Sequence, residues 1–285
     1  EPGFADLQSA ASPLRHEALP PRYGLGGAAL LGASGVDGQA HQCGDVTRQS
    51  AACGPGRGGL TGADWRPERM DLARARDIMV ESQVRPSDVT DSRIVQAMRH
   101  LPRERFAPAQ KRAVAYADLE IEVAPGRMLL RPRDLAKLIQ ALAPQAHERA
   151  LEIAGATGYG AAVLAACCKN VITLDPDGDL SFAAGAALQS CGLANVKPVS
   201  TALASGWKDE APYDVILLNG AAEVVPEAWF QQLAPGGRLG VIVRDGPVGS
   251  ARVYTRADDS FAHRTVFDAF PALTPGLERP RSFAF

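Results

Sequence analysis

Five short apolar segments recur along the second half of the chain, and each is separated from the next by an interval long enough for a helix. They are residues 149–153, 171–175, 196–201, 214–218 and 238–243. Apolar strands that alternate with helices are typical of a doubly wound, mainly parallel sheet. Such sheets bind ligands beyond the carboxyl ends of their strands. We therefore expect an α/β fold with its functional residues just after the strands.

Helical patterns precede these strands. Apolar residues lie at helical spacing in residues 72–80, in residues 94–101 behind the candidate caps Thr90 and Asp91, and in residues 135–142 between Pro132 and Pro144. We expect residues 70–145 to form an N-terminal helical lobe with a segment on the substrate side. Residues 146–285 are expected to form the Rossmann-like domain, with Phe283 and Phe285 in a last strand that closes the sheet.

Residues 1–69 differ in composition from the remainder. They hold 13 of the 28 glycines and no Ile, Lys, Asn or Met, and they show neither helical nor strand periodicity. Such a segment cannot build a core of its own. Met70 is the first methionine, and regular patterning begins just after it. We expect a disordered or non-native leader that ends before Met70; a long functional linker is the alternative.

Net charge and cysteine content limit the partners, the metal sites and the cellular compartment that we expect for this chain. The formal net charge of −2 gives no field that would attract nucleic acid or an anionic membrane, and no apolar run is long enough to span a bilayer. The five cysteines lack the paired spacings of a zinc site or a disulfide framework, and the histidines lack metal-ligand spacing. We expect a cytoplasmic protein without a bound metal, in which Cys167 and Cys168 are packing residues within a helix.

A glycine-containing loop, residues 152–160, follows the first strand. Asp175 ends the next strand, 20 residues after Gly155, where a carboxylate can accept both hydrogen bonds of a ribose diol. This arrangement predicts a nucleotide-like ligand. The loop is also similar to that of short-chain dehydrogenases, but no tyrosine of this chain is followed by lysine at the spacing those enzymes need.

Several motifs, taken in order, resemble the protein-L-isoaspartate O-methyltransferase family across most of the chain after Met70. They are the helix from Ile94 to Phe106 with its Leu-Pro-Arg-Glu-Arg-Phe ending, Ala115-Tyr116-Ala117-Asp118, Ala150-Leu151-Glu152-Ile153 with Gly158-Tyr159 and Ala161-Ala162-Val163-Leu164-Ala165, Gly206-Trp207, Ala211-Pro212-Tyr213-Asp214 and Gln232-Leu233-Ala234-Pro235-Gly236-Gly237-Arg238-Leu239. The resemblance implies a class I S-adenosylmethionine methyltransferase fold. It implies S-adenosyl-L-methionine as cofactor and isoaspartyl-containing proteins or peptides as partners, whose carboxylates are methylated to begin repair.

The resemblance and the positions after the strands together define a candidate cofactor site. It comprises Glu152, Ala154, Gly155, Ala156, Gly158, Asp175, Ala202 and Asn219. The family's Gly-x-Gly-x-Gly aligns with Ala154, Ala156 and Gly158, so two of the three glycines are replaced. If either alanine needed a positive φ, the strain would be about 1–2 kcal/mol. The acidic residue that the family has after the third strand aligns with Ala202. Cofactor affinity is therefore expected to be weakened.

The substrate side departs from the family as well. The family's Gly-Gln-Thr-Ile-Ser-Gln-Pro segment has Thr and Ser hydroxyls that contact the substrate carboxylate, and these align with Met128 and Leu130. The catalytic residues are thus unknown. Two interpretations of the nearby basic residues remain open: they supply the charge that binds the substrate carboxylate, or they form a solvated basic turn. These residues are Arg127, Arg131 and Arg133. Asp118 either contacts the substrate or binds nearby backbone N–H groups.

Three functions remain open from the sequence. The first is carboxyl methylation of isoaspartyl residues, and the second is binding or assembly by a non-catalytic relative. The third is methylation of another acceptor.

Overall fold

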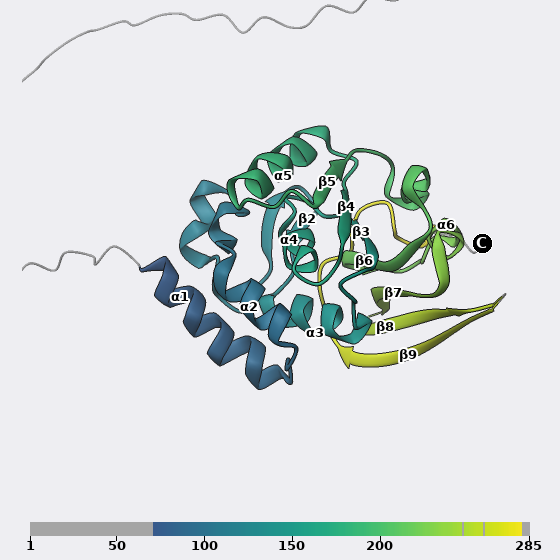
Figure 1. Cartoon of the computed structure of the whole chain (residues 1–285), viewed down its shortest axis with the longest axis horizontal. Helices are drawn as coiled ribbons and strands as arrows, with labels where there is room; N and C mark the ends of the chain where they lie inside the picture. The colour runs from purple at the N-terminus through teal and green to yellow at the C-terminus, as the bar shows by residue number, and fades with distance from the viewer. Residues whose placement is uncertain (1–70, 247, 259, 281–285) are drawn as a thin grey trace, which may run out of the picture. The chain divides into compact units, whose positions relative to one another are not determined.

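A seven-stranded sheet forms the centre of the computed structural model, which describes residues 71–246, 248–258 and 260–280 (Figure 1). Its strand order is β5-β4-β3-β6-β7-β8-β9. The strands are β3 (Arg149–Ile153), β4 (Asn170–Leu174), β5 (Val196–Val199), β6 (Tyr213–Ala222), β7 (Leu233–Asp245), β8 (Val248–Ala257) and β9 (Ser260–Asp268). The five strands from β5 to β7 are parallel. The sheet confirms the expected Rossmann-like fold.

The two last strands were not expected. β8 and β9 pair antiparallel at the β7 side of the sheet. β8 buries Ala251 and Val253 in the core, whereas most of β9 is exposed and only its Val266 and Phe267 pack, partly buried, against the core. Without a continuous apolar run, this hairpin gives a weak sequence signal. The strand predicted at Phe283 and Phe285 lies outside the described residues.

The N-terminal helices follow the sequence pattern closely. α1 (Leu72–Met79) is capped by Asp71 and continues into a π-turn. α2 (Ser92–His100) is capped by Asp91, whose side chain accepts a hydrogen bond from Arg93 N. It ends at His100, not at Phe106 as the family motif suggested, because Pro102 disfavours a helical residue before it.

The remaining helices lie between strands and in the lobe. α3 (Pro132–Leu142) buries Leu135, Leu138, Ile139 and Leu142, as predicted, and ends at Ala143 in a left-handed conformation. The others are α4 (Tyr159–Ala165), α5 (Gly178–Ser190) and α6 (Glu227–Gln231), and a two-stranded ribbon joins β1 (Ile121–Ala124) to β2 (Arg127–Leu129). One apolar cluster unites the lobe with the sheet, since it contains Met79 and Ile94 together with Val215 and Ile242. The proposed boundary between residues 145 and 146 stays a prediction, and residues 1–69 lie outside the described part.

Cys167 and Cys168 follow α4 instead of lying within it. Both are buried, as a packing role requires, and burial raises the pKa of Cys167 to about 11 and of Cys168 to about 12. These thiols are therefore protonated at neutral pH and poor nucleophiles. Whether the compartment is reducing stays a prediction.

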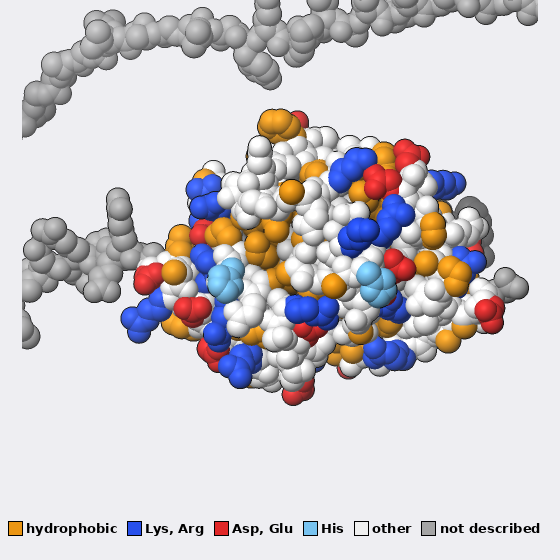
Figure 2. All heavy atoms as spheres, viewed as in Figure 1, with side chains coloured by type: hydrophobic (Ala, Val, Ile, Leu, Met, Phe, Trp, Pro, Cys, Tyr) orange, Lys and Arg blue, Asp and Glu red, His pale blue; other side chains and the backbone are white. Residues whose placement is uncertain are grey.

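The surface carries charges of both signs, and basic and acidic side chains are mixed on the face shown in Figure 2. Within the described residues, no helix has the length and apolar character to cross a membrane.

Candidate functional site

The loop between β3 and α4 is joined to the end of β4 through its backbone. Gly155 N donates to Leu174 O at 3.0 Å, and Ala156 N donates to Asp175 Oδ2 at 3.2 Å. Asp175 directly follows β4 and is only 2% exposed. The structure thus brings the predicted loop and the predicted ribose-binding carboxylate together at the carboxyl ends of the strands.

Three residues of this loop have a left-handed backbone. They are Ala154 (φ 57°), Ala156 (φ 52°) and Gly158 (φ 87°), the same positions that align with the family's three glycines. A Cβ is strained in this region, which disfavours L-residues other than glycine. The two alanines therefore store backbone strain beside the candidate site.

Gly155 and Gly160 are needed for a different reason, because a side chain at either position would overlap Glu152. A Cβ on Gly155 would overlap Thr173 Oγ1 and Glu152, and one on Gly160 would overlap the Glu152 carboxylate. Their lack of a side chain makes space for Glu152 beneath the loop. Gly155 and Gly160 therefore provide room for Glu152, whereas glycines at positions 154 and 156 would relieve backbone strain.

Glu152 is fully buried below this loop. Its Oε2 accepts a hydrogen bond of 2.7 Å from Thr173 Oγ1, whereas its Oε1 has no hydrogen-bond partner among the described residues. Burial is the main cause that raises the pKa of Glu152 to about 8, so this carboxyl group is protonated at neutral pH. Glu152 supports the loop from inside, and its predicted contact with cofactor stays a prediction.

Arg127 reaches from β2 to Asp175. Its Nε lies 3.2 Å from Asp175 Oδ2 and donates to Oδ1 at 3.3 Å. The Arg127 side chain is 11% exposed, so the interpretation of a solvated basic turn is wrong for this residue. Asp177 N also donates to Asp175 Oδ1, at 3.1 Å.

Asn219 links the loop to β2. Its Nδ2 donates to Ala154 O at 3.1 Å and to Met128 O at 3.2 Å. Asn219 lies inside β6 and not past it, in the stretch between Leu217 and Ala221 where the register with β7 shifts. This irregular pairing explains why the predicted strand was too short.

Residues 70–145, which were predicted to include the substrate side, contain an arginine that the sequence did not single out. Arg103 is fully buried, its Nη2 donates to Leu130 O at 2.7 Å, and its Nε donates to Ala115 O at 2.9 Å. Its guanidinium lies 4.7 Å from the centre of the Tyr159 ring, within cation–π range, and burial lowers its pKa. The motif Leu-Pro-Arg-Glu-Arg-Phe was the one signal that marked this position.

Leu130 is 1% exposed and packs in the apolar core, whereas Met128 is half-buried on β2. Asp118 pairs with Arg133 at 3.3 Å, and Arg133 also approaches Asp134 at 3.6 Å. The Arg133 charge is therefore already engaged by carboxylates.

Ala202 differs from the other candidate residues because it is exposed, at the start of a short turn after β5. Its methyl side chain offers neither a donor nor an acceptor.

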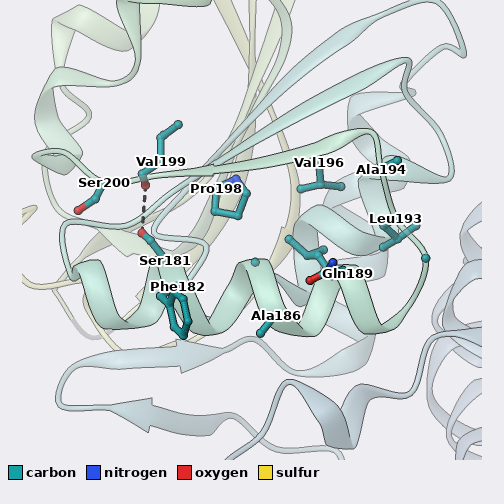
Figure 3. A pocket seen from close by; sticks show the side chains of 13 residues that line it. Ser181, Phe182, Ala186, Gln189, Leu193, Ala194, Val196, Pro198, Val199 and Ser200 are labelled. Carbon is teal, nitrogen blue, oxygen red and sulfur yellow. Dashed lines mark hydrogen bonds between the residues drawn. The ribbon is translucent and has the colours of Figure 1, made fainter.

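A groove of 860 Å³ lies along α5 and β5, and no residue of the loop between β3 and α4 lines it (Figure 3). Phe182, Leu193 and Pro198 line it, and Ser181 Oγ donates to Val199 O at 3.1 Å beside it. Among the described residues, no three His, Cys, Asp or Glu side chains group in a way that could hold a metal ion.

Comparisons with known proteins agree with one another. Residues 74–269 match the model of the family described as Protein-L-isoaspartate(D-aspartate) O-methyltransferase. A protein-L-isoaspartate O-methyltransferase of Methylorubrum populi is 39% identical over 197 residues, which are 68% of this chain and 91% of the relative. A second, of Syntrophobacter fumaroxidans, is 35% identical over 176 residues, which are 62% of this chain and 82% of the relative.

Solved structures show the same fold. A protein-L-isoaspartate O-methyltransferase superposes with a TM-score of 0.62 at 24% identity, covering 73% of this chain and 67% of its own. A Plasmodium falciparum protein described as a putative member, in complex with S-adenosyl-L-homocysteine, gives a TM-score of 0.59 at 15% identity, covering 70% and 97%. By sequence match and by fold, this chain belongs to the protein-L-isoaspartate O-methyltransferase family, whose members methylate isoaspartyl residues with S-adenosylmethionine.

Proposed function

We propose that this chain binds S-adenosylmethionine at the loop after β3 and methylates isoaspartyl carboxylates in proteins or peptides, but slowly. The observation that carries the proposal is the position of Asp175, which lies at the carboxyl end of β4 and bonds the loop through Ala156 N. A carboxylate in this place suits the two hydroxyls of a ribose. When bound, the cofactor supplies an electrophilic methyl group.

The residues fit this cofactor in their chemistry. The Asp175 carboxylate would hold the ribose, and the backbone of the loop from Ala154 to Gly158 would lie along the cofactor, with Asn219 keeping that loop on β2. The strained alanines and the Arg127 contact oppose binding, which supports a weakened affinity.

The acceptor needs no general base. A carboxyl group has a pKa of roughly 3.3–4.3 and is ionised at neutral pH, so the protein must desolvate the carboxylate and align it with the methyl group. Hydrogen-bond donors would provide that alignment. Met128 and Leu130 provide none, and a lost hydrogen bond to a charged group amounts to about 1.5–3 kcal/mol, or roughly 10- to 150-fold in rate.

A second candidate function is binding or assembly without catalysis. The burial of Leu130 favours it, because this side chain packs in the core where the family has a hydroxyl for the substrate.

Titration with S-adenosylhomocysteine tests the cofactor site first. We expect binding that Asp175→Ala weakens at least about 10-fold, since hydrogen bonds to a charged group are lost. Asp179→Ala is the matched control, because Asp179 is an exposed carboxylate close by on α5. If the Asp175 variant binds as tightly as the wild type, the ribose site is misplaced.

Methyl transfer to an isoaspartyl peptide at saturating cofactor tests catalysis. Wild-type turnover should be slow, and Met128→Thr should raise it about 10-fold if the hydroxyl regains one charged hydrogen bond. Rapid turnover by the wild type would contradict the slow rate proposed here. Cofactor binding without any methylation, in the wild type and the variant alike, would favour the non-catalytic function.

A further inference from the structure

We propose that Arg127 sets the cofactor affinity of this site by competing with the ribose for Asp175. The inference rests on the proposed function, because it concerns the same carboxylate. It assigns to Arg127 a role in cofactor affinity, in place of the acceptor-binding or solvated role that the sequence suggested.

The hydrogen bonds of Asp175 leave little room for a further donor. A carboxylate offers about four acceptor positions. Ala156 N and Asp177 N each take one oxygen, at 3.2 and 3.1 Å, and Arg127 Nε lies within 3.3 Å of both oxygens. The two backbone donors belong to the loop and to the turn after β4, so they stay in place. The two ribose hydroxyls must therefore take the positions that Arg127 holds.

The backbone around Arg127 is fixed on both sides. Gly126 has a left-handed backbone (φ 69°) and packs so closely on the Pro275 ring that a Cβ there would overlap it. On the other side, Met128 O accepts a hydrogen bond from Asn219. Displacement of the guanidinium therefore requires rotation of the Arg127 side chain and no rearrangement of β2.

The pair is shielded from solvent, since the side chains are 11% and 2% exposed. Salt screens such a pair much less than a surface pair, so the competition persists at physiological ionic strength. The side chain thus has two states, paired with Asp175 or rotated away, and the cofactor binds only the second state.

The consequence for affinity follows from the population of the binding-competent state. The apparent dissociation constant equals the intrinsic constant divided by the competent fraction. If pairing is as favourable as a typical hydrogen bond to a charged group, it corresponds to a factor of roughly 10 to 150. Removal of the guanidinium should therefore tighten cofactor binding by at least about 10-fold.

A purely structural role for the pair predicts the opposite result. In that case Arg127 would hold Asp175 in its orientation, and its removal would leave a buried carboxylate without a cation. Cofactor binding would then weaken together with the thermal midpoint.

Calorimetric titration of the full chain with S-adenosylhomocysteine distinguishes competition with the ribose from a purely structural role of Arg127. Arg127→Gln removes the charge, whereas Arg127→Lys keeps a cation at the same place and is expected to gain less affinity. Arg93→Gln is a control elsewhere in the molecule, because Arg93 on α2 forms an ion pair of 2.6 Å with Asp91, the residue that caps this helix. Stopped-flow association adds a kinetic readout, since the association rate should rise when no side chain must first leave Asp175.

We expect the Gln variant to bind at least about 10-fold tighter than the wild type, the Lys variant to lie between them, and the Arg93 control to match the wild type. Should the Gln variant fail to fold, as seen by circular dichroism, the Lys variant decides, because any gain in affinity supports the competition. Equal or weaker binding by the folded variants overturns the role of Arg127 and leaves the proposed function intact. Absence of binding by every protein, wild type included, overturns both.

Discussion

Replacement of Ala154 and Ala156 by glycine tests whether the loop stores the strain that its backbone angles imply. Both residues have left-handed φ values of 57° and 52°, and both are only 2% exposed. Relief of the left-handed conformation should stabilise the folded state by about 1–2 kcal/mol at each position.

Two opposing terms offset this relief. Glycine increases the entropy of the unfolded chain, which destabilises by roughly 0.5–1 kcal/mol, and the loss of a buried methyl group costs about 0.8 kcal/mol. The three terms nearly cancel, so each substitution should change the free energy of unfolding by less than about 1 kcal/mol.

A buried helical alanine provides the contrast. Ala136 in α3 is fully buried and has no positive φ, so Ala136→Gly incurs both costs without relief, or about 1.3–1.8 kcal/mol. Urea unfolding at equilibrium measures each variant with its m-value as a check. Losses at 154 and 156 as large as the loss at 136 would refute the reasoning, because the alanines would then carry no strain.

Two further changes test buried groups of the site. Glu152→Gln should abolish the fall in the free energy of unfolding that the Glu152 carboxyl group causes as the pH rises. The pKa of this group is 4.5 in the unfolded chain and about 8 in the fold. Between these values the folded chain keeps a proton that the unfolded chain has lost, so the free energy of unfolding of the wild type falls by about 1.4 kcal/mol per pH unit. Urea unfolding at pH 5 and pH 8 measures this for the wild type and the variant. The same change in the free energy of unfolding between the two pH values in both proteins would contradict the prediction. Leu130→Ser should lower stability by about 2–5 kcal/mol, because it removes a core side chain and buries a hydroxyl, whereas Met128→Thr on half-buried β2 should cost less; thermal unfolding compares them, and equal midpoints would show that Leu130 does not contribute to the core.

The fold could be predicted from the sequence to a large extent because its signals are local. The five parallel strands coincide with short, mostly apolar segments, although β5 also contains Lys197. α3 shows a single apolar face between Pro132 and Pro144, so apolar patterning and helix breakers define these elements. The β8–β9 hairpin lacked such a signal, since most of β9 faces solvent.

The candidate site could be predicted less completely because its decisive contacts join distant parts of the chain. The loop and Asp175 were expected together from the order of the strands, and the structure places them so. The Arg127–Asp175 pair spans 48 residues, and the hydrogen bond from buried Arg103 to Leu130 O spans 27. Neither contact produces a periodic pattern in the sequence. The sequence alone therefore could not show that Arg127 pairs with Asp175 or that Arg103 is buried with a hydrogen bond to Leu130 O.

The positions at which the sequence predicts departures from the family are occupied by buried or paired side chains of the chain itself. The methyl groups of Ala154 and Ala156 are buried, Leu130 packs in the core, and Arg127 occupies the acceptor positions of Asp175. We expect Leu130 to stabilise the folded chain at a position where the resemblance implies a hydroxyl for the acceptor. We expect the Arg127–Asp175 pair to stabilise it at the proposed ribose site, because loss of Arg127 would leave a buried carboxylate without a cation. Stability and activity are thereby opposed at these residues. Substitutions that reopen the site should raise affinity or turnover and lower the free energy of unfolding together. The alanines are the exception, because strain relief there offsets the lost packing, so they are the positions at which the cofactor loop can be restored at the smallest loss of stability.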